Sequence, residues 1–184
     1  GYSDIGAFGA EIDTPTLDRL ADGGLRMTQF YNAARCCPSR AALVTGLNPH
    51  QAGMGLMSDQ TIRIPSYQGY LNEQSATIAD LLGEAGYHTS ISGKWHLGEE
   101  EGQWPNHHGF ERSFSFIHGA ASFFDNLPYR NDEWPWSDGK VFTTLDGEIY
   151  DYLEGTYSTD LYTDYALDFI REAQEQERPF FLYL

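Results

Sequence analysis

The segment from Ala34 to Gly46, with the sequence ARCCPSRAALVTG, constrains the fold of this chain more than any other stretch. Proline is tolerated at the start of a helix because the first N–H groups there have no acceptor within the helix. Pro38 therefore predicts a short apolar helix that ends at Gly46, with Cys36 just before its first turn. The N-terminus of such a helix carries unpaired N–H groups and partial positive charge, which favour a bound anion.

Two side chains beside this helix start bear directly on its chemistry. Arg40 would place a guanidinium there, a group well shaped to hold a tetrahedral oxyanion. Cys36 and Cys37 have three ordinary interpretations: buried small hydrophobes, half of a disulfide, or metal ligands. Because adjacent cysteines pair only with strain, they cannot form a cross-linking framework.

A second motif follows a predicted helix and strand. A helix from Ser75 to Gly86, with Ile78, Leu81, Leu82 and Ala85 on one face, leads into a strand over 87–92. That strand delivers Lys94 and His96 at its end, where ligands lie in α/β sheets. A nucleotide P-loop is excluded, because His88 and Trp95 occupy the positions that need a glycine and a Ser or Thr. A surface lysine and a core histidine are the alternatives.

The rest of the chain predicts further α/β elements. A helix capped by Thr14 stops at Gly23 and Gly24, and a strand follows over 26–31 with Met27, Phe30 and Tyr31 in the core. Near the end of the chain, a helix begins at Ser158 and a strand covers 180–184. The apolar face of that helix consists of Leu161, Tyr165, Ala166, Phe169, Ile170 and Ala173. The last strand is apolar on both faces, which favours a central parallel position.

The segment 99–157 is aromatic, charged and irregular. We interpret it as a loop-rich insertion that shapes a substrate pocket. Its aromatic side chains favour a flat leaving group or serve ordinary packing: Phe123, Phe124, Tyr129, Trp134 and Trp136.

The net charge of −16 argues against nucleic acid and anionic membrane surfaces as partners. We interpret the acidic surface as solvated, so that a few local cations decide the site. The longest acidic run, Glu99 to Glu101, is short, which supports this interpretation. No apolar stretch is long enough to span a bilayer.

Both motifs resemble the signatures of the type I sulfatases. The first is Cys36-x-Pro38-x-Arg40 followed by Thr45-Gly46, and the second runs from Gly86-Tyr87 to Gly93-Lys94-x-His96. The resemblance, to bacterial arylsulfatases, covers nearly the whole chain. It implies an α/β fold, the alkaline-phosphatase-like three-layer α/β/α sandwich with a mixed, mostly parallel sheet. Residues 1–184 would be the N-terminal part of the catalytic domain, a fragment cut at both ends.

The resemblance also implies a mechanism for sulfate monoesters of small molecules. A formylglycine-generating enzyme would convert Cys36 to formylglycine, whose hydrate is the nucleophile and contacts a divalent cation, Ca²⁺ or alternatively Mg²⁺. Arg40 would hold this diol, Lys94 would neutralise a sulfate oxygen, and His96 would assist deprotonation of the second hydroxyl. His50 and His118 are further candidates for substrate contacts, although for His50 we favour a turn-capping role. The remaining metal ligands and the acid for the leaving group would lie outside the chain, so this stretch alone should show little turnover.

Two rival functions fit the same residues. Relatives of the same fold use formylglycine to hydrolyse phosphonates or phosphodiesters. A non-catalytic anion-binding homologue is the second alternative, although such a protein need not retain Cys36, Pro38, Arg40, Lys94 and His96 together.

Overall fold

The computed structural model describes residues 4–62, 64–124, 142–152 and 155–184, in two compact units, Gly1–Asn32 and Ala33–Leu184. The first unit contains the 3₁₀ turn η2 (Gly6–Phe8) and helix α1 (Pro15–Gly23). The Thr14 hydroxyl accepts a hydrogen bond from the Gly6 N–H at 2.8 Å and donates to Asp18 Oδ1 at 3.0 Å, which ties η2 to α1. The predicted helix between Thr14 and Gly24 is confirmed.

The predicted strand over 26–31 is wrong. These residues adopt no regular structure, and Met27, Phe30 and Tyr31 are 54%, 74% and 84% exposed, so they are not core. A strand needs hydrogen bonds to a neighbouring strand, and the described part of the first unit contains no strand that could pair with these residues.

A five-stranded mixed sheet organises the second unit, in the order β4-β3-β2-β1-β5. Strand β1 (His88–Lys94) lies parallel to both β2 (Arg112–Phe116) and β5 (Phe180–Tyr183). Strands β3 (Thr143–Leu145) and β4 (Glu148–Tyr150) continue it antiparallel. Asp146 and Gly147 join them with φ of 51° and 90°, the left-handed backbone of a tight hairpin.

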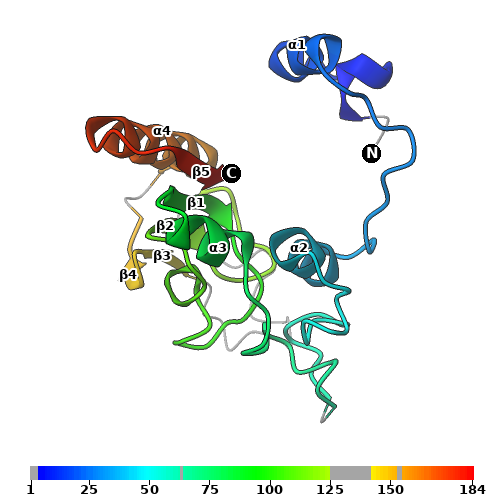
Figure 1. Ribbon diagram of the computed structural model, residues 1–184, viewed down its shortest axis with the longest axis vertical. Helices are drawn as coiled ribbons and strands as arrows, with labels where there is room; N and C mark the ends of the chain where they lie inside the picture. The colour runs from blue at the N-terminus through cyan, green and yellow to red at the C-terminus, as the bar shows by residue number, and fades with distance from the viewer. Residues whose placement is uncertain (1–3, 63, 125–141, 153–154) are drawn as a thin grey trace. The chain divides into compact units, whose positions relative to one another are not determined.

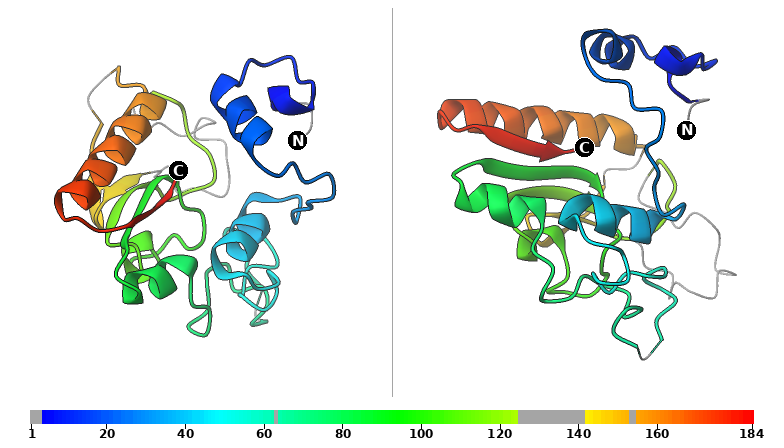
Figure 2. Two further views of the ribbon diagram at one scale, coloured as in Figure 1. Left: turned by 45° about the horizontal axis from the view of Figure 1, so that its top comes forward. Right: turned by 45° about the vertical axis from the view of Figure 1, so that its right-hand side comes forward.

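Helices cover both faces of this sheet, as Figures 1 and 2 show. Helix α4 (Ser158–Glu175) lies on one face, and α2 (Cys36–Thr45) and α3 (Ile78–Glu84) lie on the other. The predicted three-layer α/β/α arrangement with a mostly parallel centre is therefore confirmed. The predicted apolar face of the last helix is also confirmed, since Ala166, Phe169 and Ala173 are buried.

Three details of the sequence interpretation are corrected. The third helix begins at Ile78 rather than Ser75, because Thr77 caps it in a capping box with Asp80. The predicted buried face of this helix is also wrong, because Ile78 and Leu81 are 40% and 61% exposed and Ala79 is buried. In so short a helix the apolar periodicity fits more than one buried face, so the sequence could not select the right one. Strand β5, predicted to be central, lies at the edge of the described sheet.

The segment 99–157 contributes β2, β3, β4 and the 3₁₀ turn η3 (Pro105–His107) where it is described. Its role in shaping a substrate pocket stays a prediction. Three of its aromatic residues, Tyr129, Trp134 and Trp136, lie outside the described residues.

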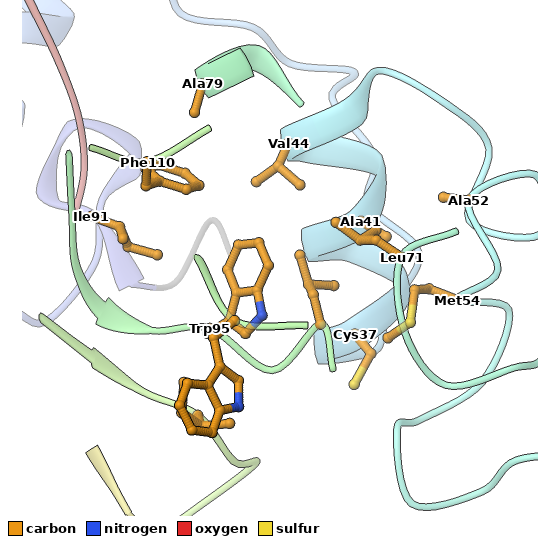
Figure 3. Close-up of a cluster of buried hydrophobic side chains, with 13 residues drawn as sticks. Cys37, Ala41, Val44, Ala52, Met54, Leu71, Ala79, Ile91, Trp95 and Phe110 are labelled. Atoms are coloured by element: carbon orange, nitrogen blue, oxygen red, sulfur yellow. The ribbon is translucent and has the colours of Figure 1, made fainter. Parts of the chain in front are cut away.

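The core between the sheet and α2 is centred on Trp95, which is fully buried. Figure 3 shows α2 between Trp95 on one side and Ala52 and Met54 on the other. On the opposite face of the sheet, Phe114 stacks on Tyr165 of α4 with ring centroids 4.0 Å apart. Within the described residues, no helix is both long and apolar enough to traverse a bilayer.

Replacing Phe114 with alanine should lower the free energy of unfolding by about 3 to 5 kcal/mol, because the side chain is fully buried. Phe180→Ala is the matched control: this side chain is 45% exposed on the edge strand, so we expect a loss under about 1.5 kcal/mol. Urea denaturation of both variants measures the difference. Equal losses would show that the core between α4 and the sheet is misplaced.

Candidate active site

Helix α2 places Cys36 at its N-terminus. Arg35 is the N-cap, Cys36 is the first helical residue and Pro38 is the third. Cys36 therefore lies within the first turn of the helix, whereas the sequence predicted it just before that turn. Pro38 is tolerated at the third position because the N–H groups of the whole first turn lack helical acceptors. Gly46 ends the helix as predicted, with φ of 69° and its N–H bonded to the Ala42 carbonyl.

Arg40 fastens this helix to the sheet. Its Nη1 donates to the backbone carbonyl of Lys94 at 2.5 Å and to the hydroxyl of Tyr183 at 3.2 Å. These acceptors lie on β1 and β5, so one guanidinium joins α2 to two parallel strands. Arg40 also lies close enough to Lys94 and His96 for its positive charge to lower the pKa of both side chains.

Lys94 ends β1 with its ammonium group close to Cys36. The Nζ atom donates to the carbonyl of Gly119 at 2.6 Å, in the loop after β2. Burial lowers the pKa of Lys94, an effect that the Cys36 thiol opposes and the positive charge of Arg40 reinforces. The site therefore holds an ammonium group that is poorly hydrated and suited to an anionic partner.

His96 lies just beyond the strand with a left-handed backbone, φ 56°. Its ring is buried, with a side-chain exposure of 4%, and Nδ1 has no hydrogen-bond partner among the described residues. Burial, and then the charge of Lys94, lower the pKa of His96 to about 3. A Cβ atom built on Gly119 would lie 2.8 Å from His96 Cε1, so only glycine leaves room for this ring.

The two cysteines and His96 meet at the helix start. One ligand atom from each of Cys36, Cys37 and His96 lies within 4.8 Å of the others, the one such group of three or more in the described residues. The Cys36 thiol also contacts Met57 Sδ at 3.6 Å. Sulfur and imidazole donors suit zinc or softer ions, whereas calcium takes oxygen ligands.

The adjacent cysteines differ in environment. Both are free thiols, with Cys36 half-buried and Cys37 fully buried. Burial raises the pKa of Cys37 to about 12, so this thiol stays protonated near neutral pH. Of the two thiols, only that of Cys36 is partly exposed.

Glu99 belongs to the same cluster. The sequence analysis missed this residue, because it treated Glu99 as part of a solvated acidic run. Its Oε1 accepts a hydrogen bond from the Ser58 hydroxyl at 2.6 Å, and its Oε2 lies 3.3 Å from His118 Nδ1. Burial alone would raise the pKa of Glu99, but the hydrogen bonds from His118 and Ser58 outweigh it and lower the pKa. The only sequence signal that could have identified Glu99 was its position three residues after His96.

The two additional histidine candidates differ. His118 lies at the site, with its ring 15% exposed and its Nδ1 turned toward Glu99. His50 is exposed, and its Nδ1 lies 3.1 Å from Asn48 Oδ1, two residues back in the same turn. Its ring also packs edge-on against Tyr67. The structure thus brings together Cys36, Arg40, Lys94, His96 and His118, and gives His50 the contacts of a turn residue.

Sequence comparison supports the resemblance that the motifs suggested. The protein family described as Sulfatase matches residues 1–184. An arylsulfatase of Klebsiella aerogenes is 38% identical over 189 residues, covering 100% of this chain and 39% of that protein. Arylsulfatase A of Homo sapiens is 36% identical over 208 residues, covering 100% of this chain and 38% of that protein. The chain therefore spans less than two-fifths of the length of these relatives.

The structure comparison gives the same result. The crystal structure of Ps i-CgsB in complex with k-i-k-neocarrahexaose matches with a TM-score of 0.80 and 30% sequence identity. The match covers 100% of this chain and 42% of the solved chain.

His96 should remain neutral through the physiological pH range. Its folded pKa of about 3 lies below the usual 6.5, so between these values the unfolded chain binds a proton that the folded chain does not. Stability should accordingly fall as the pH drops from 6.5 toward 3. NMR titration of the imidazole signals, assigned with His96→Asn, tests this. A His96 midpoint between about pH 5 and 8 would contradict it.

Proposed function

The chain belongs to the sulfatase family, and from this membership we propose that the protein is a sulfuric ester hydrolase of the arylsulfatase type. Its substrates would be sulfate monoesters of small molecules. One observation carries the proposal: Cys36 at the N-terminus of α2 meets His96 and the Lys94 ammonium group in one partly buried cluster. Such a cluster offers a reactive residue, a cation and a proton acceptor around the position of a tetrahedral anion.

Cys36 would act after conversion to formylglycine by a formylglycine-generating enzyme. The aldehyde hydrate supplies one hydroxyl that attacks sulfur and a second whose deprotonation expels sulfate by C–O cleavage. An unmodified thiol would instead form a sulfur-linked sulfate that is hard to release. The fully buried Cys37, with its raised pKa, cannot substitute for Cys36.

Arg40 and Lys94 would provide the positive charge. Lys94 lies close enough to Cys36 to interact with its side chain, so its ammonium could neutralise a non-bridging sulfate oxygen. Arg40 would hold the helix N-terminus and the diol in place, since its guanidinium already bonds the Lys94 carbonyl. Both cations are in place before a substrate arrives, which avoids reorganisation in the transition state.

His96 would accept the proton from the second hydroxyl. Its Nδ1 is buried without a partner in the described residues, and a neutral ring has a lone pair to offer. A bound sulfate would raise the pKa of this ring, because a nearby negative charge favours the imidazolium. The ring can therefore take up the proton at the step that releases sulfate.

The resemblance also implies a divalent cation, Ca²⁺ or alternatively Mg²⁺. The unmodified residues do not fit such an ion, because Cys36, Cys37 and His96 offer sulfur and nitrogen rather than oxygen. Residue 36 would supply an oxygen only in its formylglycine form. The other metal ligands remain a prediction for residues outside this chain.

The substrate class follows from the relatives. The K. aerogenes protein is named an arylsulfatase, and Ps i-CgsB was solved with an oligosaccharide. We therefore propose aryl or saccharide sulfates, and the aromatic residues Phe123 and Phe124, 64% and 49% exposed, remain candidates for contact with the leaving group.

The two adjacent cysteines give a sharp test of the nucleophile. Cys36→Ala should lower kcat/KM for 4-nitrophenyl sulfate by at least about 10³-fold, because the nucleophile is lost. Cys37→Ala should stay within about 10-fold, since it truncates only a core side chain. The full-length protein is produced in a host that has the converting enzyme, and turnover is measured for both variants.

Mass spectrometry of the peptide that contains residue 36, cut at acidic residues, should show an aldehyde in place of the thiol. An intact thiol with no turnover would favour the non-catalytic anion-binding homologue. Turnover of bis(4-nitrophenyl) phosphate exceeding that of the sulfate ester would favour the phosphodiesterase alternative.

Arg40 provides a second test. Arg40→Gln removes the charge and the bonds to Lys94 and Tyr183, so we expect a loss of about 10²- to 10³-fold in kcat. Arg171→Gln is the control, because Arg171 is exposed on α4 and pairs only with Asp168 among the described residues. Similar activity of the two variants would contradict the role given to Arg40.

A further inference from the structure

Glu99 is the one inward-facing member of three successive glutamates. Its side chain is 30% exposed, whereas Glu100 and Glu101 are exposed residues. Both of its oxygens have partners, Ser58 Oγ at 2.6 Å and His118 Nδ1 at 3.3 Å. Its Oε1 also lies 3.9 Å from His96 Nε2, too far for a hydrogen bond but close enough for the charge to act on the ring.

This carboxylate connects the segments that surround Cys36. Ser58 follows Met57, whose sulfur contacts the Cys36 thiol at 3.6 Å. His118 precedes Gly119, whose carbonyl accepts the Lys94 ammonium at 2.6 Å and whose missing side chain makes room for His96. A shift of the 118–119 loop would therefore move the acceptor of Lys94 and the wall behind His96 together.

His118 is held in a defined orientation. Glu99 faces its Nδ1, and Phe142 packs edge-on against the ring with centroids 4.8 Å apart. A carboxylate at Nδ1 selects the tautomer with its proton on that nitrogen. The opposite nitrogen, Nε2, is buried and has no hydrogen-bond partner among the described residues, so its lone pair remains available.

We propose that Glu99 is a positioning residue of this site, which acts through His118 and the 118–119 loop to hold Lys94 and His96 in place. The proposal rests on the proposed sulfatase function for its kinetic consequence. The two close partners of the Glu99 carboxylate are Ser58 and His118. Glu99 fixes the tautomer of His118 and the position of the Gly119 carbonyl.

The kinetic test compares Glu99→Gln and Glu99→Ala with Glu101→Gln in the full-length, formylglycine-containing protein. We expect the Glu99 variants to lower kcat by about 10- to 100-fold, the size of effect seen when an orienting partner is removed. KM should change less than kcat, because the catalytic groups themselves are retained. Glu101→Gln should match the wild type. The double variant Glu99→Ala, His118→Asn should be no slower than Glu99→Ala alone if Glu99 acts through His118.

A spectroscopic test is independent of activity. ¹⁵N shifts of the His118 ring should report a proton on Nδ1 in the wild type and in Glu101→Gln, and a mixture of tautomers in Glu99→Ala. Unchanged tautomers together with unchanged kcat in the Glu99 variants would overturn the proposal. If the wild-type protein hydrolyses no sulfate ester, the proposed function fails, and the tautomer result alone decides whether Glu99 positions His118.

Discussion

The hydrogen bond from Arg40 to the Lys94 carbonyl joins the two halves of this site. Arg40 belongs to the helix that presents Cys36, and Lys94 ends β1, the strand that leads into His96 and Glu99. A carbonyl at the end of a buried strand needs a donor, and a guanidinium can serve it and the neighbouring Tyr183 hydroxyl together. The spacing of the candidate catalytic groups therefore depends on a backbone acceptor as much as on their own side chains.

The electrostatics of the site differ from those of the chain as a whole. The net charge is −16, yet two cations, Arg40 and Lys94, gather around Cys36. The nearby carboxylate of Glu99 is occupied by Ser58 and His118 and does not pair directly with Lys94 in the described structure. An anionic substrate would thus meet local positive charge in a poorly hydrated setting, where each interaction is stronger than at the surface.

The parts of the fold that follow from repeating patterns were predictable from sequence. The long helix α4 has enough turns for its apolar periodicity to fix the buried face, and the two motifs located Cys36, Arg40, Lys94 and His96. The segment 26–31 has strand-like composition but no pairing partner in the first unit, and pairing cannot be read from composition. Glu99 looked like a surface residue because its partners are distant in sequence: Ser58 lies 41 residues before it.

The left-handed backbone of His96 could not be predicted from the sequence either. Alternation along a strand would have oriented residues 94 and 96 alike, but β1 ends at Lys94 and His96 turns into the left-handed region. Glycine tolerates that backbone freely, and asparagine, aspartate and histidine adopt it more often than other side chains. Residues with bulky or branched side chains are strained there whatever their chemistry. Position 96 therefore accepts few side chains without backbone strain, and among those few only histidine carries a ring nitrogen that can accept a proton.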